Sequence, residues 1–246
     1  MSRNNTILQP YAIPVYSFLS FLDQKINNDE LKKPLKILDC GAGGPIPPLS
    51  LFAEQGYNTW GIDISDEQLD RAKQYCMDHD LEINFQKADM CQIPFADNTF
   101  DCVYEHYSMC HLSKKDTAKA VEEIYRVLKH DGYAFLGIIS MDCWPKSNYG
   151  NEKDPGEFWV DENSGSYMHS MFTDEEADQL VNRWQVISKE KQTRYLKKYA
   201  DRISKEKWQK LFAESSKEYT ENEWIQLYNN RLNKLVYSHI HFILKK

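Results

Sequence analysis

The feature that most limits how this chain can fold is a short apolar run that ends in a glycine-rich loop. Ile37 and Leu38 lead into Asp39, and the loop at residues 40–44 contains three glycines. A second apolar run ends at Asp63. A buried strand, a glycine turn, a helix and a second strand ending in an acid form the first βαβ unit of a nucleotide-binding sheet. The chain is therefore expected to be an α/β protein with its site at this loop.

The glycine pattern argues against a dinucleotide as the ligand. Gly41 and Gly43 supply the first two positions of the Gly-x-Gly-x-x-Gly fingerprint, but position 46 is Ile46, where that fingerprint has its third glycine. The acid Asp39, just before the glycines, is also foreign to it. The loop alone is therefore a weak signal, and the acids that follow later strands carry more information.

Apolar periodicity extends the sheet along most of the chain. A continuous apolar run at residues 133–139 is typical of a central strand buried on both faces. The last segment alternates apolar and polar residues, which is typical of a strand with one solvated side. Strands are expected at residues 36–40, 58–63, 83–87, 100–105, 133–139, 185–194 and 236–244, and helices at residues 11–22, 47–53, 65–76, 117–128 and 173–184.

Three segments stand apart from this pattern. Residues 1–30 are expected to form an N-terminal helical cap, and residues 142–170 a long aromatic loop that closes the site as a lid. Residues 196–234 have helix-like spacing and are expected to be a helical insertion, which forms a second lid, a satellite core or a homodimer face. The α/β domain then comprises residues 31–195 and 235–246.

Composition narrows the setting and the partners. The chain has 246 residues, a net charge of −7 and a pI of about 5.5, which disfavours a nucleic-acid partner because phosphate backbones call for basic patches. Its six cysteines form no Cys-x-x-Cys pair, which favours a reducing, cytoplasmic setting. No signal peptide and no apolar stretch of about 20 residues is seen, so no membrane association is expected.

Several stretches, taken together and in order, resemble the class I S-adenosylmethionine-dependent methyltransferases. The resemblance is nearest to the small-molecule group that includes the ubiquinone-biosynthesis methyltransferases. The matching stretches are residues 37–43, 61–65, 88–90, 93–101 and 123–132. The resemblance implies a Rossmann-like three-layer sandwich with a mostly parallel seven-stranded sheet whose last two strands lie at one edge. It also implies S-adenosylmethionine as the cofactor.

The resemblance assigns roles to the first loop and the second strand. Gly41 and Gly43 would approach the methionine part of the cofactor through their backbone, and Asp39 would orient its ammonium, directly or through water. Asp63 would hold the ribose hydroxyls, with Ile64 against the adenine. From the residues alone, Asp63 could instead cap a helix, although its place at a strand tip favours the ribose role. In this reading the loop binds the charged end of an amino acid, with no pyrophosphate.

Further roles follow from the later strands. Asp89 would bind the adenine amino group, although a turn acid is the alternative, and Met90 would pack on the ring or in the core. Glu105 and His106 would line the methionine and substrate side. Tyr11, in the N-terminal helix, would lie at the cofactor mouth.

The segment after residues 100–105 carries the candidates for acid–base chemistry. His106, Cys110 and His111 do not have zinc-ligand spacing with a second pair, so no metal site is expected. His106 and His111 are instead candidate bases, because ligands bind beyond the carboxyl ends of such strands and histidine titrates near neutral pH.

The chain is thus expected to be a methyltransferase that moves a methyl group to a small-molecule acceptor by in-line displacement. An RNA or protein methyltransferase is the first alternative, disfavoured by the acidic charge. A non-catalytic cofactor-binding subunit is the second, and Asp63 and Asp89 argue against it.

Overall fold

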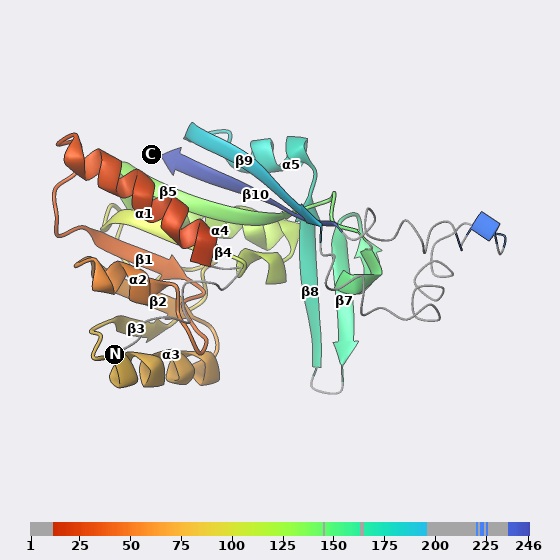
Figure 1. Ribbon diagram of the computed structural model, residues 1–246, viewed down its shortest axis with the longest axis horizontal. Coiled ribbons are helices and arrows are strands. Elements are labelled where there is room, and N and C mark those ends of the chain that lie inside the picture. The colour runs from red at the N-terminus through yellow and green to blue at the C-terminus, as the bar shows by residue number, and fades with distance from the viewer. Residues whose placement is uncertain are drawn as a thin grey trace.

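A ten-stranded mixed sheet organises the part of the chain that the computed structural model describes, which is residues 12–144, 146–162, 165–195, 220, 222–223, 225 and 236–246 (Figure 1). The strands are β1 (Lys36–Cys40), β2 (Asn58–Asp63), β3 (Asn84–Lys87), β4 (Phe100–His106), β5 (Leu128–Ser140), β6 (Asn151–Asp154), β7 (Glu157–Glu162), β8 (Gly165–Phe172), β9 (Gln185–Tyr195) and β10 (Val236–Lys245). The helices are α1 (Ala12–Asn27), α2 (Leu49–Glu54), α3 (Asp66–His79), α4 (Lys114–Val127) and α5 (Asp174–Leu180), with 3-10 turns η2 (Met109–His111) and η3 (Lys146–Tyr149).

Seven of these strands form the expected Rossmann-like sheet. Strands β3, β2, β1, β4 and β5 are neighbours in that order and run parallel. Strand β10 pairs antiparallel with β5, and β9 pairs antiparallel with β10 at the edge. The order β1-β4 is the switch point where the chain changes direction along the sheet, and ligands bind beyond the carboxyl ends of the strands at such a point.

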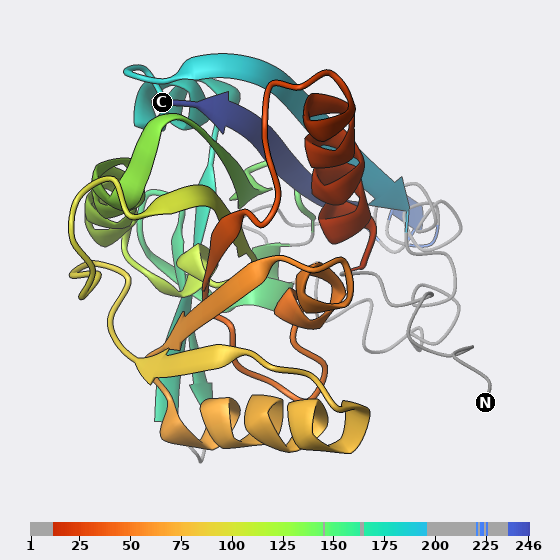
Figure 2. The same ribbon diagram turned by 90° about the vertical axis from the view of Figure 1, so that its left-hand side faces the viewer.

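One face of the sheet is covered by α1 and α2 (Figure 2). Phe18 of α1 is fully buried, with its ring centroid 5.8 Å from that of Phe135 on β5 and 6.3 Å from that of Tyr104 on β4. Leu19 and Leu22 lie in the same core, as their helical spacing predicted. The N-terminal helix is therefore anchored on the sheet by its apolar stripe.

The opposite face packs against α4 and α5. Ala120, Val121, Ile124 and Val127 lie at helical spacing on α4, and all are buried in one cluster with alternate residues of β4, β5 and β10. Because successive side chains of a strand point to opposite faces, β5 contributes Leu136 to this cluster and the adjacent Phe135 to the other. Two helical layers thus enclose the sheet, as the sequence predicted.

The segment expected to be an aromatic loop, residues 142–170, is largely strand instead. Strands β6, β7 and β8 form an antiparallel sheet, and β8 joins the main sheet by pairing with Ile139 and Ser140 of β5. These two residues lie beyond Gly137, the last residue that β5 pairs with β4. The prediction of a loop was wrong because β6 is exposed along its whole length and so lacks the apolar alternation that identifies strands.

Strand β5 begins at Leu128, five residues before the strand that was expected at residues 133–139, and residues 130–132 form a bulge within it. Leu128 pairs with Phe100 and Tyr133 with Cys102, so the intervening residues of β5 bulge out of register. Asp131, rather than Gly132, adopts the positive φ of 62°. A Cβ on Gly132 would lie 2.9 Å from the carbonyl oxygen of Asp101, so the glycine is needed for close packing. The predicted insertion at residues 196–234 lies almost wholly outside the described residues.

Candidate functional site

A pocket of about 490 Å³ lies at the carboxyl ends of the parallel strands. It collects residues from the loop after β1, the tip of β2, the segment after β3 and the turn after β4. Its lining residues are Gly41, Ile62, Asp63, Ile64, Gln68, Ala88, Asp89, Met90, Ser108, His111 and Leu112. Five of the residues proposed from the sequence for the cofactor, and the candidate base His111, are therefore brought together at one place.

The loop after β1 uses its own amides to hold its shape. The N–H groups of Gly41 and Ala42 donate to the carbonyl oxygen of Ile62 at 2.8 and 2.9 Å, and that of Gly44 donates to the Gln68 carbonyl oxygen at 2.9 Å. The Gly43 N–H donates to the Asp63 carboxylate at 3.0 Å. Since all four amides have acceptors within the protein, the loop does not offer the row of N–H groups that binds a pyrophosphate.

Asp63 links the loop to the second strand. Its Oδ2 accepts from Gly43 N–H, and its Oδ1 accepts from Ser65 N–H at 2.9 Å. A carboxylate has about four lone-pair sites, so two hydrogen bonds leave room for two donors from a ligand. The helix cap of α3 is Ser65, whose hydroxyl accepts from Gln68 N–H. Asp63 is therefore not the helix cap, and its carboxylate lies at the pocket wall.

The far side of the pocket is apolar and open. Ile64 leaves 68% of its surface exposed, which is unusual for an isoleucine beside a folded core. Met90 is half-buried on the other side. Asp89 also lines the pocket. Its carboxylate accepts from Cys91 N–H at 2.8 Å, so it stabilises a local turn, which was the alternative role expected for this acid.

Two buried carboxyl groups lie beneath the loop. Asp39 is 2% exposed, and its Oδ2 has no hydrogen-bond partner among the described residues. Burial raises the pKa of Asp39 well above its ordinary value, and the carboxylates of Glu105 and Asp63 raise it further. An unpaired buried carboxyl oxygen is costly unless a cation or donor meets it. This arrangement fits an ammonium group of a ligand.

Glu105 is fully buried and shapes the turn after β4. Its Oε1 accepts from the N–H groups of Ser108 and Met109 at 2.9 and 2.8 Å, which holds Ser108 at the pocket. Burial raises the pKa of Glu105 to about 7, although the backbone N–H groups of Met109, Ser108 and Gly137 act in the opposite direction. Glu105 thus acts on the pocket through the backbone and does not itself line it, so its expected role in lining the site requires this correction.

The raised pKa of Glu105 predicts a pH-dependent stability. The ordinary pKa of a glutamate is 4.5, whereas that of folded Glu105 is about 7. Between these two pH values the folded chain keeps the proton on Glu105 and the unfolded chain has lost it. The free energy of unfolding therefore falls as the pH rises through this window. The loss amounts to about 3 kcal/mol. Glu105→Gln should abolish this pH dependence. In urea unfolding, the free energy of unfolding of the variant should therefore rise relative to that of the parent protein between pH 5 and pH 8. Parallel pH profiles for the two proteins would contradict this.

The two candidate histidine bases lie at different places. His111 lines the pocket, and its Nδ1 lies 2.9 Å from the Met168 carbonyl oxygen of β8. Because a carbonyl oxygen only accepts, Nδ1 carries the proton and Nε2 has the lone pair. His106, at the end of β4, instead faces His239 and His241 of β10.

Reasoning from the sequence missed several of these residues. Gln68 and Ser108 line the pocket, and their signal was only that they follow the second and fourth strands. No metal site was expected because His106 was considered only with the nearby Cys110 and His111. The structure instead places His106 beside His239 and His241, which are more than 130 residues away in the sequence. The available signal was the alternation of these two histidines in the last strand. Tyr11 lies outside the described residues.

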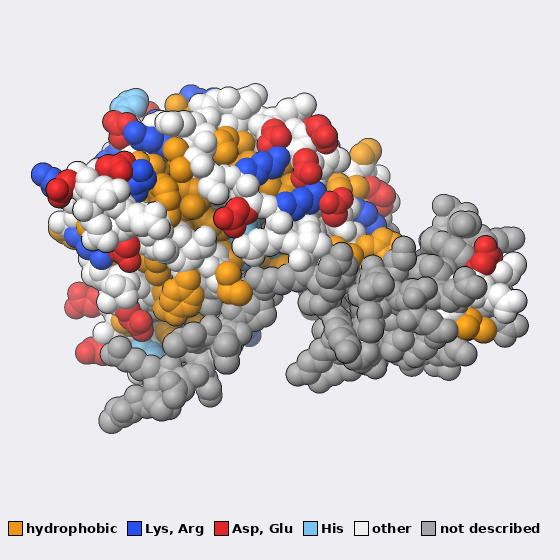
Figure 3. Space-filling view, turned by 45° about the horizontal axis from the view of Figure 1, so that its top comes forward, with side chains coloured by type: hydrophobic (Ala, Val, Ile, Leu, Met, Phe, Trp, Pro, Cys, Tyr) orange, Lys and Arg blue, Asp and Glu red, His pale blue; other side chains and the backbone are white. Residues whose placement is uncertain are grey.

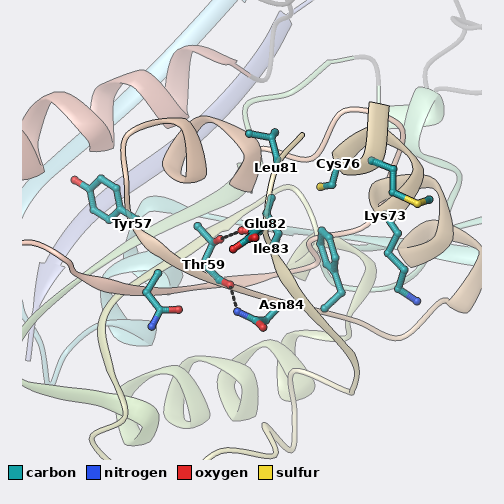
Figure 4. Close-up of a pocket in the computed structure, with 11 residues that line it drawn as sticks. Tyr57, Thr59, Lys73, Cys76, Leu81, Glu82, Ile83 and Asn84 are labelled. Carbon is teal, nitrogen blue, oxygen red and sulfur yellow. Dashed lines mark hydrogen bonds between the residues drawn. The ribbon is translucent and has the colours of Figure 1, made fainter. Parts of the chain in front are cut away.

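A larger cavity of about 700 Å³ opens at the opposite end of β2 and β3, against α3 (Figure 4). Thr59 lies at its centre, donating to the Glu82 carbonyl oxygen at 3.2 Å and accepting from the Asn84 side chain at 3.1 Å. These polar groups satisfy one another, and the cavity is at the amino ends of the strands, where such sheets do not bind their ligands. We therefore assign the site to the smaller pocket.

Acidic and basic side chains lie side by side on the surface formed by α5 and β9 (Figure 3). Lys189 pairs with Asp178 at 2.6 Å and Lys191 with Asp174 at 2.9 Å. This face thus differs from the continuous basic surface that nucleic acids require. Among the described helices, none has the length and apolar character needed to span a bilayer.

Comparison with known proteins identifies the segment that holds the pocket. Residues 38–136 match the family described as "Methyltransferase domain". The chain is similar to the sterol 24-C-methyltransferase erg-4 of Neurospora crassa, with 38% identity over 106 residues, which are 42% of this chain and 27% of the relative. It is also similar to the cycloartenol-C-24-methyltransferase of Arabidopsis thaliana, with 33% identity over 131 residues, 51% of this chain and 38% of the relative.

The match therefore spans only 27% of the length of the Neurospora crassa relative and 38% of the length of the Arabidopsis thaliana relative. Among solved structures, a SAM-dependent methyltransferase from Methanosarcina mazei superposes with a TM-score of 0.63 at 19% identity, covering 89% of this chain and 96% of that one. At this identity the likeness establishes the fold.

Proposed function

We propose that this chain, whose residues 38–136 form a class I methyltransferase domain, transfers a methyl group from S-adenosylmethionine to a small-molecule acceptor. The observation that carries the proposal is the buried, unpaired oxygen of Asp39 beneath a loop whose amides are all engaged. That arrangement suits an amino acid's ammonium and does not suit a pyrophosphate.

Residues that line the pocket or lie buried next to it offer a partner for each part of the cofactor. Asp39 is buried and is not among the residues that line the pocket, and we assign it to the ammonium. The lone pairs left on Asp63 accept from the ribose hydroxyls. Ile64 and Met90 cover the two sides of the adenine, and Asp89 accepts from its amino group. Burying the 68% exposed surface of Ile64 contributes favourably to binding.

When bound, S-adenosylmethionine supplies a methyl group activated by a positively charged sulfur. The chain's task is to hold the acceptor in line and to exclude water. We propose that His111 takes the proton that the acceptor's nucleophilic atom loses. Its Nδ1 is committed to the Met168 carbonyl oxygen, so Nε2 is the atom that receives the proton.

The sheet formed by β6, β7 and β8 is proposed as the acceptor side of the site. It reaches His111 through Met168, and it places the ring of His169 5.1 Å from that of His111. Burial lowers the pKa of His169, which keeps this imidazole neutral near pH 7. A neutral wall of rings suits a small organic acceptor better than a phosphate backbone. The six free cysteines support a reducing, cytoplasmic setting.

Calorimetry with S-adenosylmethionine tests the cofactor assignment, and labelled cofactor offered with a metabolite extract or with RNA tests the acceptor class. Label in a small molecule and none in RNA supports the proposal. Label in RNA or in a protein favours the first alternative, and cofactor binding without transfer to any acceptor favours a non-catalytic subunit. If the chain does not bind S-adenosylmethionine, the proposed function and both alternatives are refuted.

The raised pKa of Asp39 predicts that cofactor binding releases a proton. The free chain holds Asp39 protonated to a higher pH than usual, and a bound ammonium favours its ionised form, so affinity should rise with pH. Calorimetry in buffers of different ionisation enthalpy measures the released proton directly. Asp39→Asn should abolish the release and weaken binding at pH 8 by about 10-fold to 100-fold. Equal proton release from the variant would exclude Asp39 as the ammonium partner.

A further inference from the structure

Three histidines from two distant segments converge on one face of the sheet. His106 is the last residue of β4, and His239 and His241 are alternate residues of β10, so both β10 side chains point to the same face. Strand β5 separates β4 from β10. Its residue Gly137 is the register partner of both His106 and His241.

Gly137 makes this convergence possible. A Cβ at this position would lie 2.4 Å from Cδ2 of His106 and 3.4 Å from Cδ2 of His241. The two imidazoles therefore lean toward each other over a strand residue that has no side chain. Their ring centroids are 5.2 Å apart, although their own strands are not neighbours. Any other residue at position 137 would separate them.

The third ring is held in place by aromatic neighbours. Tyr107 stacks on His239 with the ring centroids 5.4 Å apart and the planes 10° from parallel, and Tyr237 lies 4.2 Å from it on a similar plane. His239 and His241 are buried, and His106 is half-buried. One nitrogen from each of the three rings lies within 4.8 Å of one from each of the others.

We propose that His106, His239 and His241 bind a divalent transition-metal ion of the zinc class. Imidazole nitrogens are preferred ligands of zinc and its neighbours and poor ligands of magnesium and calcium. Nitrogens bound to one tetrahedral zinc are about 3.4 Å apart, so closing the present spacing needs small rotations of the rings and no movement of the strands.

The ligand set leaves one coordination position open. A tetrahedral ion with three protein ligands keeps its fourth position for water or for a substrate atom. The ring of Tyr107 lies 5.4 Å from that of His239 and 6.4 Å from that of the pocket residue His111, so the three histidines lie near the proposed methyl-transfer site. Resting on that proposed function, we assign the open position to an ionisable oxygen or sulfur of the acceptor.

Metal binding is tested without cofactor or acceptor, so it can fail or succeed independently of the proposed methyl transfer. The full-length chain is stripped with a chelator and titrated with Zn²⁺ by calorimetry and with Co²⁺ by visible absorption. The expected result is one ion per chain, cobalt bands typical of tetrahedral coordination, and no binding of Mg²⁺. Absence of zinc and cobalt binding by the folded parent chain would overturn the proposal.

Single substitutions locate the ion. His239→Gln and His241→Gln should each weaken zinc binding at least 10-fold, whereas His169→Gln, a buried histidine outside the three, should leave it unchanged. Gly137→Ala keeps all three imidazoles and should also weaken binding at least 10-fold, because its Cβ separates His106 from His241. Thermal unfolding with and without zinc serves as the folding control: zinc should raise Tm in the parent chain and in His169→Gln. An equal rise in His239→Gln and His241→Gln would overturn the assignment.

Discussion

Replacing Gly43 with alanine is expected to weaken the binding of S-adenosylmethionine by at least about 100-fold, or about 3 kcal/mol. A Cβ at this position would lie 2.5 Å from Oδ2 of Asp63 and 2.5 Å from Cβ of Gln68. Real Cβ atoms do not approach other atoms so closely, so the Asp63 carboxylate must move away from the loop. That movement breaks its hydrogen bond from Gly43 N–H and displaces the lone pairs proposed to meet the ribose.

Gly44→Ala provides a matched control. Gly44 has a φ of +109°, so alanine there is strained, but its Cβ would meet nothing within 4 Å. Gly44→Ala thus adds about 1 kcal/mol of backbone strain without displacing the Asp63 carboxylate. Calorimetry should show less than a 10-fold loss of affinity for Gly44→Ala. If the two variants lost affinity equally, strain in the loop, and not the position of Asp63, would control binding.

Replacing His111 with asparagine is expected to lower kcat by about 100-fold to 10,000-fold, the usual contribution of a general base. The asparagine side-chain amide can still donate to the Met168 carbonyl oxygen, as Nδ1 of His111 does at 2.9 Å. It has no atom that can replace Nε2 in taking a proton. The affinity for S-adenosylmethionine should change only a few-fold, since His111 is assigned to the acceptor and not to the cofactor.

The split between kcat and KM separates a base from a structural residue. His111→Asn should lower kcat, whereas the KM for the acceptor should stay close to that of the parent chain. His130→Asn, at an exposed histidine far along the chain from the pocket, should behave as the parent does. A His111 variant with the parent's turnover would remove this residue from the mechanism.

The sequence predicted the first two strands and several of the residues that line the pocket closely, and for identifiable reasons. The strands at residues 36–40 and 58–63 were predicted with the bounds that the structure has, since each is a short apolar run followed by glycine or acid. Asp63, Ile64, Asp89 and Met90 could be placed at the pocket because they follow strand ends, and the carboxyl ends of parallel strands share one edge.

The strands β6–β8 and the contacts between distant strands were harder to predict because their determinants are not periodic. Strand β6 is exposed throughout, so nothing in its residue pattern distinguished it from a loop. The convergence of His106 with His241 depends on which strand lies between them and on the register of two ladders around Gly137. Register is set by long-range packing, which the local sequence does not encode.

The junction between β8 and the main sheet has an evolutionary consequence. The three-stranded sheet joins β5 through only two paired residues, and it reaches His111 through the main-chain oxygen of Met168, which every amino acid possesses. The exposed side chains of β6–β8 can therefore diverge without loss of the contact that orients the imidazole. An ancestor with this architecture could acquire new acceptors through substitutions in β6–β8, or by replacement of these strands, while the pocket at the ends of the parallel strands stayed unchanged.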